Sequence, residues 1–460
     1  MSGPAERVGG SFRDPSGFVF SRGGKIFRQV NLSYRKEFDK LTSSGLYQEL
    51  VDVGALIPHT LTEEKPVDAE KAYLVIAPER VPFVSYPYEW SFSQLKDAGL
   101  LTLRIALAAL QKNMVLKDAS AYNIQFVGGK PVLIDTLSFA LYKEGAPWEA
   151  YRQFCQHFVA PLALAALVDI RLTQLMRVYI DGIPLDLASR LLPGKTRLGL
   201  SGLALHIHLH AKTQQRFSGT ATPVGAVQLS KTALIGLLKG LEKTLQELKW
   251  EPKGTEWGEY YSATNYSNQA LKSKGEIVGS FIEIAKPARV IDLGANDGLF
   301  SREASRRGIE TVASDIDPAA VEKNYRVVKQ TKEERILPIV LDLTNPSGGI
   351  GWANEERTSL VERGPFDLVM GLALIHHLVI ANNVPLLSVA GFFGSMGKWA
   401  IVEFVPKTDS QVQRMLASRK DIFTSYTVEG FEKAFATVFS LEKKEPVPES
   451  DRILYLFKKK

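Results

Sequence analysis

The chain has 460 residues, of which 45% are hydrophobic and 23% are charged. These are ordinary values for globular proteins, so the composition excludes a disordered, fibrous or low-complexity chain, and the length predicts two or three domains. The net charge of +6 permits an acidic partner. Lys and Arg are nevertheless scattered along the sequence, so charge alone does not indicate a nucleic-acid-binding protein.

The first half of the chain begins with strand patterns and continues with helical ones. Strands are predicted at Gly17–Phe20, Lys25–Val30 and Tyr73–Ala77. Helices are predicted at Leu95–Asn113 and Trp148–Val168. This order indicates a small sheet followed by a helical lobe, which is an α+β domain over residues 1–215.

A linker is predicted where the apolar periodicity lapses into Thr, Gln, Ser, Gly and Pro between Ala211 and Gly225. After it, leucines recur at helical spacing over Lys231–Lys249, so this stretch is predicted to be an amphipathic helix. It spans few heptads, which favours packing on its own domain over a dimerisation coiled coil. We assign residues 216–250 to the linker and this helix.

From residue 251 to residue 460, strand runs alternate with helical ones. The strands are expected at Arg289–Leu293, Thr311–Ser314, Ile336–Leu341, Asp367–Leu372 and Trp399–Phe404. Such alternation predicts an α/β domain with a doubly wound parallel sheet, which binds ligands at the carboxyl ends of its strands.

The single cysteine and the short apolar runs indicate the cellular compartment in which the protein is expected. Cys155 alone excludes an internal disulfide framework and a Cys-rich metal site, and a reducing cytoplasm fits it. Residues 1–17 are polar and Gly-rich, without the apolar stretch of a signal peptide. The longest apolar run, Phe158–Val168, contains Pro161 and is too short to cross a bilayer. We therefore expect a cytoplasmic protein with no membrane partner.

A Gly-containing turn follows the first predicted strand of the C-terminal domain, in the run Asp292-Leu-Gly-Ala-Asn-Asp-Gly298. Gly294 and Gly298 allow a tight turn and a close approach of the backbone to a ligand. Their spacing does not meet the fingerprint of dinucleotide-binding proteins, so the turn by itself identifies no ligand.

Acidic residues end the next two strands. Asp315 stands where a carboxylate would accept both hydroxyls of a ribose, and Asp342 where one would accept from the amine of adenine. No Gly-rich turn is followed by the Lys and Ser or Thr that a triphosphate requires. These positions predict a cationic nucleoside as the ligand.

With these residues the C-terminal domain resembles the class I S-adenosylmethionine-dependent methyltransferases. The resemblance implies that Asp292 orders the turn and supports the amino-acid end of S-adenosyl-L-methionine, while Gly294, Asn296 and Gly298 form the turn around it. It also implies a Rossmann-like fold, with Asp315 at the ribose and Asp342 at the adenine. The alternative is an unrelated Rossmann-type domain with acidic strand ends.

The fourth strand ends in Leu374-Ile-His-His-Leu378, on the side that faces the transferred methyl group in this fold. The Asn- or Asp-Pro-Pro-aromatic motif of enzymes that methylate exocyclic base amines is absent, and the sequence resembles that of methyltransferases acting on small molecules. His376 or His377 is therefore a candidate general base, because histidine titrates near neutral pH. The alternative is a packing or capping role.

Two further features lie near this predicted edge. Glu403, at the end of the fifth strand, is expected either to orient a substrate or His377 or to be an ordinary carboxylate. The stretch Trp257–Ser267 is rich in aromatic and hydroxyl groups, and Tyr261, Asn265 and Tyr266 suit a lid over the cofactor or an aromatic packing seam.

The first half contains Asp118 and Asn123 at the spacing of the catalytic loop of kinases, and Asp135 where the second metal ligand falls. It thus resembles a kinase-like domain with a possible nucleotide site. It departs from that family by lacking a Gly-rich loop and the strand lysine, which Arg28 is a candidate to replace. We expect a degenerate kinase-like domain that presents substrate.

These features together predict S-adenosylmethionine-dependent methyl transfer, with no metal at the methyltransferase site. A saccharide or another small molecule is the favoured acceptor, ahead of protein and then RNA. Nucleic acid thus stays open as a partner. The alternative function is a module that binds the cofactor without turnover.

Overall fold

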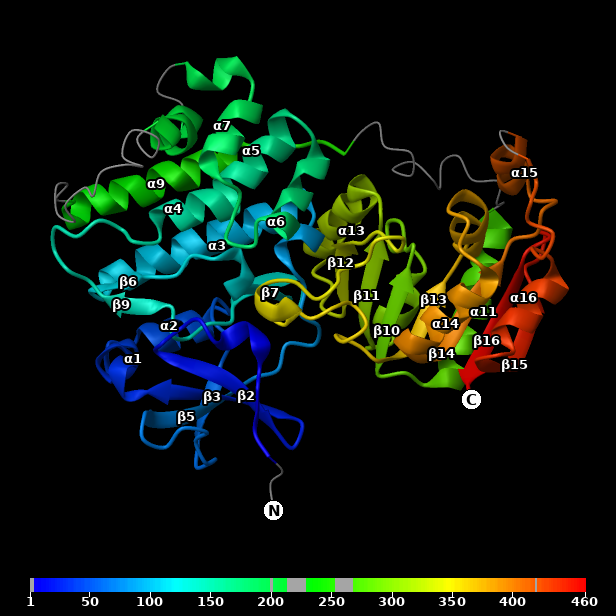
Figure 1. Cartoon of the computed structure of the whole chain (residues 1–460), viewed down its shortest axis with the longest axis horizontal. Helices are drawn as coiled ribbons and strands as arrows, with labels where there is room; N and C mark the ends of the chain where they lie inside the picture. Colours follow the sequence, from blue (N-terminus) through cyan, green and yellow to red (C-terminus); the bar gives the residue numbers. More distant parts are fainter. Residues whose placement is uncertain (1–3, 199–201, 213–228, 253–267, 418–419) are drawn as a thin grey trace. The chain divides into compact units, whose positions relative to one another are not determined.

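The computed structural model describes residues 4–198, 202–212, 229–252, 268–417 and 420–460. The chain divides into two compact units. Unit 1 comprises Met1–Trp250 together with Gly349–Arg357, and unit 2 comprises Glu251–Gly348 and Thr358–Lys460. The two units are described separately, and Figure 1 labels their elements.

Unit 1 begins with an antiparallel sheet of five strands in the order β1-β2-β3-β5-β4. Its strands are β1 (Glu6–Arg7), β2 (Gly17–Arg22), β3 (Lys25–Asn31), β4 (His59–Thr62) and β5 (Ala72–Pro78). A two-residue turn joins β2 to β3, and both of its residues, Gly23 and Gly24, have positive φ angles, which glycine adopts without strain. Helices α1 (Arg35–Ser43) and α2 (Leu46–Asp52) lie between β3 and β4 in the sequence.

The rest of unit 1 is mainly helical. Its helices are α3 (Phe92–Gln111), α4 (Tyr151–Phe154), α5 (Ala160–Leu167), α6 (Leu175–Val178), α7 (Leu185–Leu191) and α9 (Lys231–Glu247). Two short antiparallel pairs follow α3, namely β6 (Met114–Leu116) with β9 (Phe139–Leu141) and β7 (Ile124–Val127) with β8 (Lys130–Leu133). A capping box formed by Ser91 and Gln94 starts α3, which explains why this helix begins three residues before its predicted start.

The amphipathic helix α9 packs within unit 1. Its leucine stripe faces α3, where Gly99 leaves so little room that an added Cβ would lie 2.8 Å from Leu245. The ammonium of Lys96 also donates to the backbone carbonyls of Gln246 and Leu248, at 2.9 and 2.8 Å. The structure thus provides a partner surface for the stripe inside the chain.

Unit 2 contains a seven-stranded sheet in the order β12-β11-β10-β13-β14-β16-β15. Its strands are β10 (Arg289–Leu293), β11 (Glu310–Asp315), β12 (Ile336–Val340), β13 (Phe366–Gly371), β14 (Gly397–Phe404), β15 (Phe439–Pro446) and β16 (Ile453–Lys459). The five neighbours β12, β11, β10, β13 and β14 are parallel to one another. Strand β16 pairs antiparallel with β14, and β15 pairs antiparallel with β16. This is a doubly wound arrangement, because the order reverses between β10 and β13.

Helices cover both faces of this sheet (Figure 1). They are α11 (Asn268–Ala285), α12 (Ser301–Ser305), α13 (Pro318–Thr331), α14 (Leu386–Met396) and α16 (Val428–Phe435), whereas α15 (Ser410–Ala417) lies beyond the strand ends. On one face, Phe281 of α11 packs with Leu368, Ile401 and other buried side chains of the strands. On the other, Phe435 of α16 stacks on Phe457 of β16, with 5.1 Å between ring centroids.

The predicted strands of both halves are confirmed, with ends that move by one or two residues. Among the features not predicted are the antiparallel pair β15 and β16, the short strands β1, β4 and β6 to β9, and the π-helix Cys155–Val159 that divides the helix expected at Trp148–Val168. The linker residues 213–228 lie outside the described residues. Within the described ranges, no helix combines the length and the hydropathy that a bilayer span demands.

Candidate functional site

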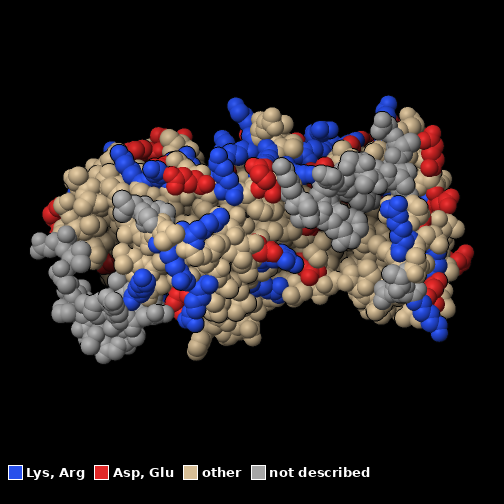
Figure 2. Space-filling view, turned by 90° about the horizontal axis from the view of Figure 1, so that it is seen from above, with Lys and Arg blue, Asp and Glu red and all other residues tan. Residues whose placement is uncertain are grey.

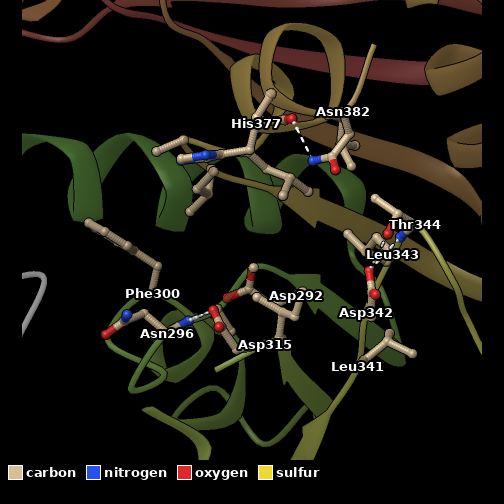
Figure 3. A pocket seen from close by; sticks show the side chains of 18 of the residues that line it. Asp292, Asn296, Phe300, Asp315, Leu341, Asp342, Leu343, Thr344, His377 and Asn382 are labelled. Atoms are coloured by element: carbon tan, nitrogen blue, oxygen red, sulfur yellow. Dashed lines mark hydrogen bonds between the residues drawn. The ribbon is translucent and has the colours of Figure 1, made fainter. Parts of the chain in front are cut away.

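A cavity of about 370 Å³ opens at the carboxyl ends of the parallel strands of unit 2 (Figure 3). It lies where the strand order reverses, which is the place at which open α/β sheets bind ligands. Six of the nine predicted site residues line it, namely Asp292, Gly294, Asn296, Asp315, Asp342 and His377. Gly298, His376 and Glu403 are not among its lining residues. Its volume suits a ligand of nucleoside size.

The turn after β10 forms one wall of the cavity. Gly294 has a φ of +73° and donates its N–H to the carbonyl of Ser314 at 2.9 Å, so β10 and β11 stay joined through the turn. Gly298 also has a positive φ, +81°, and an added Cβ there would collide with Asn324 of α13. Gly298 therefore serves the packing of the turn rather than the cavity itself.

Asp292 is a buried carboxylate in this cavity, with 1% of its surface exposed. Its Oδ2 accepts from the hydroxyl of Ser301 at 2.6 Å, whereas its Oδ1 has no hydrogen-bond partner among the described residues. Burial raises the pKa of Asp292 to about 7, against the opposing effects of Ser301 and Lys274. A buried polar atom without a partner calls for a water, an ion or a ligand.

Asp315 lies at the end of β11, beside Asp292 in Figure 3. Its Oδ2 accepts from the backbone N–H of Asn296 at 2.7 Å and its Oδ1 from that of Asp317 at 2.8 Å. Burial raises the pKa of Asp315 to about 6, although these backbone hydrogen bonds lower it. Since each carboxylate oxygen has two lone pairs, Asp315 can still accept hydroxyl groups from a ligand.

Asp342 follows β12 and is more open than the other two carboxylates. Its Oδ1 accepts from the backbone N–H of Thr344 at 2.8 Å and from its hydroxyl at 2.7 Å. These bonds fix the loop Leu341–Thr344, all four residues of which line the cavity.

A buried ionic network behind the cavity was missed by sequence reasoning. Lys274 of α11 lines the cavity, lies 4.4 Å from the ring centroid of Phe300 and forms an ion pair with Glu403 at 2.6 Å. Glu403 is fully buried and lies 3.8 Å from Arg452, which pairs with Asp409 at 2.8 Å. Burial lowers the pKa of Lys274, and Glu403 opposes the shift. Glu403 is thus part of an internal network.

A signal for Lys274 was present in the sequence. Ala270, Lys274 and Val278 recur at four-residue spacing and all are buried, so the lysine interrupts an apolar helix stripe. A charged residue in such a stripe is rarely buried unless it is paired or functional. Phe300, Thr344 and Asn382 also line the cavity and carried no comparable pattern.

The two adjacent histidines differ in position. His377 lines the cavity, and its backbone carbonyl accepts from the side-chain amide of Asn382 at 2.9 Å (Figure 3). His376 is buried, and its ring centroid lies 4.1 Å from that of His377. Burial lowers the pKa of His377 to about 4 and holds that of His376 well below its ordinary value, so both rings are neutral at pH 7.

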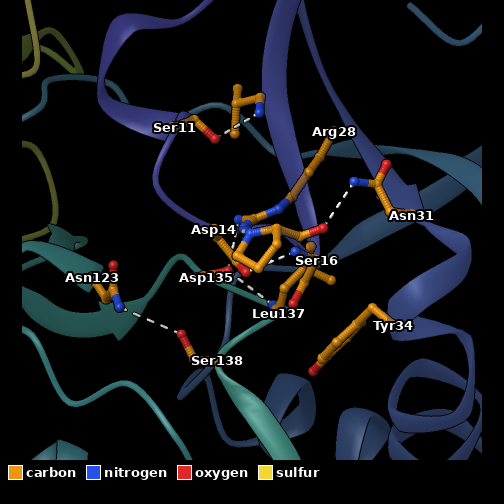
Figure 4. A network of polar contacts seen from close by, with 12 residues as sticks. Ser11, Asp14, Ser16, Arg28, Asn31, Tyr34, Asn123, Asp135, Leu137 and Ser138 are labelled. Carbon is orange, nitrogen blue, oxygen red and sulfur yellow. Dashed lines mark hydrogen bonds and ion pairs between the residues drawn. The ribbon is translucent and has the colours of Figure 1, made fainter. Parts of the chain in front are cut away.

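The candidate residues of the N-terminal half meet in a polar cluster of unit 1 (Figure 4). Arg28 of β3 forms an ion pair with Asp135 at 2.6 Å and lies 3.9 Å from Asp14. The side chain of Asn123 donates to the hydroxyl of Ser138 at 3.4 Å. The cluster therefore joins the sheet to the two loops that follow α3.

The candidate Asp118 and its neighbour Lys117 have other contacts. Asp118 accepts from the backbone N–H of Ser120 at 3.0 Å and from the side chain of Gln153 at 2.8 Å. Lys117 donates to Ser16 at 2.8 Å and lies 4.9 Å from the ring centroid of Tyr34. The predicted lid, with Tyr261, Asn265 and Tyr266, lies outside the described residues.

The fold defines a two-unit protein with a cavity at the carboxyl ends of a doubly wound sheet. Over 462 aligned residues the chain is 37% identical to nodulation protein NoeA of Rhizobium meliloti (strain 1021), covering 98% of this chain and 96% of that protein. The chain belongs to the NoeA family. No protein-family model matches it.

Solved structures resemble parts of the chain at low identity. Magnesium protoporphyrin IX methyltransferase (ChlM) from Synechocystis PCC 6803, with bound SAH, is 14% identical, with 44% of this chain and 93% of that chain covered and a TM-score of 0.32. The methyltransferase domain of bacterial CtHen1 is 17% identical, with 41% and 99% covered and a TM-score of 0.30. WbdD is 17% identical, with 47% and 46% covered and a TM-score of 0.30. Similarity at this level does not assign a function to the chain.

Proposed function

We propose that unit 2 is a class I methyltransferase domain that binds S-adenosyl-L-methionine in the cavity at the end of its sheet. The observation that carries the proposal is the buried Oδ1 of Asp292, which has no hydrogen-bond partner among the described residues, in a side chain that lines the cavity together with a second buried carboxylate, Asp315. A ligand with a positive charge and hydroxyl groups would satisfy both carboxylates.

The proposed orientation follows from the lining residues. Asp292 would hold the ammonium of the amino-acid end and Lys274 its carboxylate, because the two side chains offer opposite charges in the same cavity. Asp315 would accept the ribose hydroxyls, and Asp342 the amine of adenine. The bound cofactor supplies an electrophilic methyl group on a sulfonium, and the protein's part is to bind, orient and exclude water.

His377 is proposed as the residue that takes a proton from the acceptor as the methyl group arrives. Its neutral ring is the form that can accept a proton, although the low pKa makes it a weak base. Replacing His377 with Asn would then lower turnover and leave cofactor affinity nearly unchanged, because the role is felt in the transition state. Replacing the buried His376 would act on stability instead.

We propose a saccharide or another small molecule as the acceptor, with protein and RNA as alternatives. The strand end at Leu372–Leu374 lacks the motif that grips the amine of a base, and these residues line the cavity. On the face drawn in Figure 2, Lys and Arg are scattered with Asp and Glu among them, which gives little support to a nucleic-acid track.

Calorimetry of the full chain with S-adenosylhomocysteine tests the cofactor assignment. Asp315→Ala should weaken binding by about 1–3 kcal/mol through loss of charge-assisted hydrogen bonds to the ribose. Glu310→Gln, at the other end of the same strand, is the matched control and should bind like the wild type. Absence of a binding heat with folded wild-type protein at millimolar ligand would remove the assignment.

The acceptor and the alternative function are tested with labelled cofactor. A cell extract is fractionated into small molecules, protein and RNA, and each fraction is incubated with the protein and labelled S-adenosylmethionine. Label in the small-molecule fraction supports the favoured acceptor class. Tight cofactor binding without label in any fraction supports the binding module instead.

We also propose that unit 1 is a kinase-like domain that has lost efficient phosphoryl transfer and presents the acceptor. The likeness is supported by Arg28 on β3 together with Asp118, Asn123 and Asp135. The ion pair between Arg28 and Asp135 supports the loss, because it engages a carboxylate that would otherwise hold a metal ion.

A further inference from the structure

A hairpin inserted between β12 and β13 belongs to unit 1, although both flanks of the sequence belong to unit 2. Its ends are joined by a pair of backbone hydrogen bonds between Ile350 and Arg357, each 3.1 Å. Residues Trp352–Asn354 form a short 3-10 turn at its tip. We call residues 349–357 the inserted hairpin.

The inserted hairpin is held by the first loop of unit 1. Glu356 is buried, and its Oε1 accepts from Nε and Nη2 of Arg13 at 2.7 and 2.6 Å. Its backbone packs so closely on this loop that a Cβ added to Gly10 would lie 2.7 Å from the carbonyl oxygen of Glu356. Arg13 is followed by Asp14 of the polar cluster, so the hairpin fixes the loop that carries this carboxylate.

The hairpin also contacts the loop that carries Asn123. The guanidinium of Arg357 lies 4.2 Å from the ring centroid of Tyr122, and the hydroxyl of Tyr122 donates to the carbonyl of Met176 at 3.2 Å. Tyr122 and Asn123 are neighbours in one short 3-10 helix. Two loops of the polar cluster are therefore held by the same inserted segment.

The docking of the hairpin is incomplete. Oε2 of Glu356 and Nε of Arg357 are buried and have no hydrogen-bond partner among the described residues. Buried polar atoms without partners cost free energy, so the docked hairpin is opposed by a desolvation penalty of its own. This penalty reduces the free-energy difference between the docked and the undocked hairpin, so the population of the docked form is sensitive to small changes.

The same connection begins at the cofactor cavity. Residues Leu341–Thr344 line the cavity, and the side chain of Asp342 fixes the backbone of Thr344. Only residues 345–348 separate Thr344 from the hairpin. A ligand that orders Leu341–Thr344 would therefore also restrict the motion of residues 345–348, which connect this loop to the hairpin.

We propose that the inserted hairpin couples the cofactor cavity of unit 2 to the polar cluster of unit 1. The inference rests on the proposed function: a bound cofactor orders Leu341–Thr344, favours the docked hairpin and thereby orders residues 9–16 and 121–123. Because coupling is reciprocal, a ligand of the polar cluster would raise the affinity for the cofactor.

Hydrogen exchange of the full chain with and without S-adenosylhomocysteine tests the coupling. In the wild type, the ligand should slow exchange at residues 292–298 and 341–344, and by about threefold or more at residues 9–16 and 121–123. In Glu356→Gln the protection at the cavity should remain and the protection at residues 9–16 and 121–123 should be lost. Glu355→Gln, an exposed neighbour on the same hairpin, is the matched control and should behave like the wild type.

Two outcomes would overturn the inference. Protection at residues 292–298 and 341–344 of the wild type, without any change at residues 9–16 or 121–123, would contradict the coupling and leave the proposed function intact. No protection at residues 292–298 would contradict the proposed function and the coupling together. Arg13→Gln removes the same ion pair from the other side and serves if Glu356→Gln does not fold.

Discussion

The two polar sites of the molecule treat their carboxylates differently. In unit 1, Asp135 is paired with Arg28 at 2.6 Å. In unit 2, Asp292 is buried with one oxygen lacking a described partner, and burial raises its pKa to about 7. The charge of Asp135 is thus balanced by a side chain of the protein, whereas one oxygen of Asp292 is available to a ligand.

This difference separates a structural use of charge from a binding use. The carboxylate of a close ion pair already has a cationic partner and gains little from an added cation, because binding would first have to break the pair. A buried carboxylate with one unpartnered oxygen, such as Asp292, destabilises the protein without ligand and gains from a cationic ligand. The same residue type thus indicates support in one unit and ligand binding in the other.

The largest effect on stability is expected when a substitution breaks the ion pair between Arg28 and Asp135 in unit 1. Asp135→Ala removes the close partner of the Arg28 guanidinium and leaves only Asp14, at 3.9 Å, which should lower the free energy of unfolding by about 3 kcal/mol. Denaturant unfolding without nucleotide or metal measures it. The double variant Arg28→Met with Asp135→Leu should recover most of the loss, and an unchanged stability of Asp135→Ala would show that the pair is not structural.

The second prediction concerns the cost of the unpaired carboxylate. The folded pKa of Asp292, about 7, lies above its ordinary value of 3.8, so this group favours folding below pH 3.8 and loses that contribution as the pH rises to 7. Asp292→Asn should therefore raise the free energy of unfolding at pH 8 by about 1–3 kcal/mol, and by less at pH 5. An equal effect at both pH values would contradict the raised pKa.

The third prediction uses the same carboxylates in binding. Burial raises the pKa values of Asp292 and Asp315 to about 7 and 6, and the proposed contacts with the ligand's ammonium and ribose hydroxyls are strongest when both groups are ionised. The affinity for S-adenosylhomocysteine should fall about tenfold or more between pH 7.5 and 5.5, with proton release on binding. Calorimetry in buffers of different ionisation enthalpy measures the release, and a pH-independent affinity would argue against these roles.

The smallest expected effect concerns nucleotide at unit 1. Because Arg28 engages Asp135, magnesium with ATP should shift the melting temperature of the full chain by less than about 1 °C. A clear rise that Asp135→Ala removes would show that the metal ligands still bind. ATP-dependent phosphorylation of a substrate, lost in Asp118→Ala, would make unit 1 an active kinase domain.

The periodic parts of the fold could be predicted from the sequence. The parallel strands β10 to β14 are continuous apolar runs, and Asp292, Asp315 and Asp342 follow from their strand ends because parallel strands end at one edge. Long-range pairings could not be predicted in this way. Lys274 and Glu403 lie 129 residues apart in the sequence, and the antiparallel strand β16 inserts beside β14 only through tertiary packing.

The hairpin that carries Glu356 also bears on how the polypeptide is made. Arg13 and Glu356 are separated by 343 residues, so a ribosome adding about 5–20 residues per second would take about 20–70 s between them. Throughout that interval the loop that carries Arg13 is present, but the inserted hairpin that holds it has not been synthesised. Unit 1 is complete only after β12 and the inserted hairpin have been synthesised. Until then, the surface on which the hairpin docks is open to the hairpin of a neighbouring chain, which would give a domain-swapped pair.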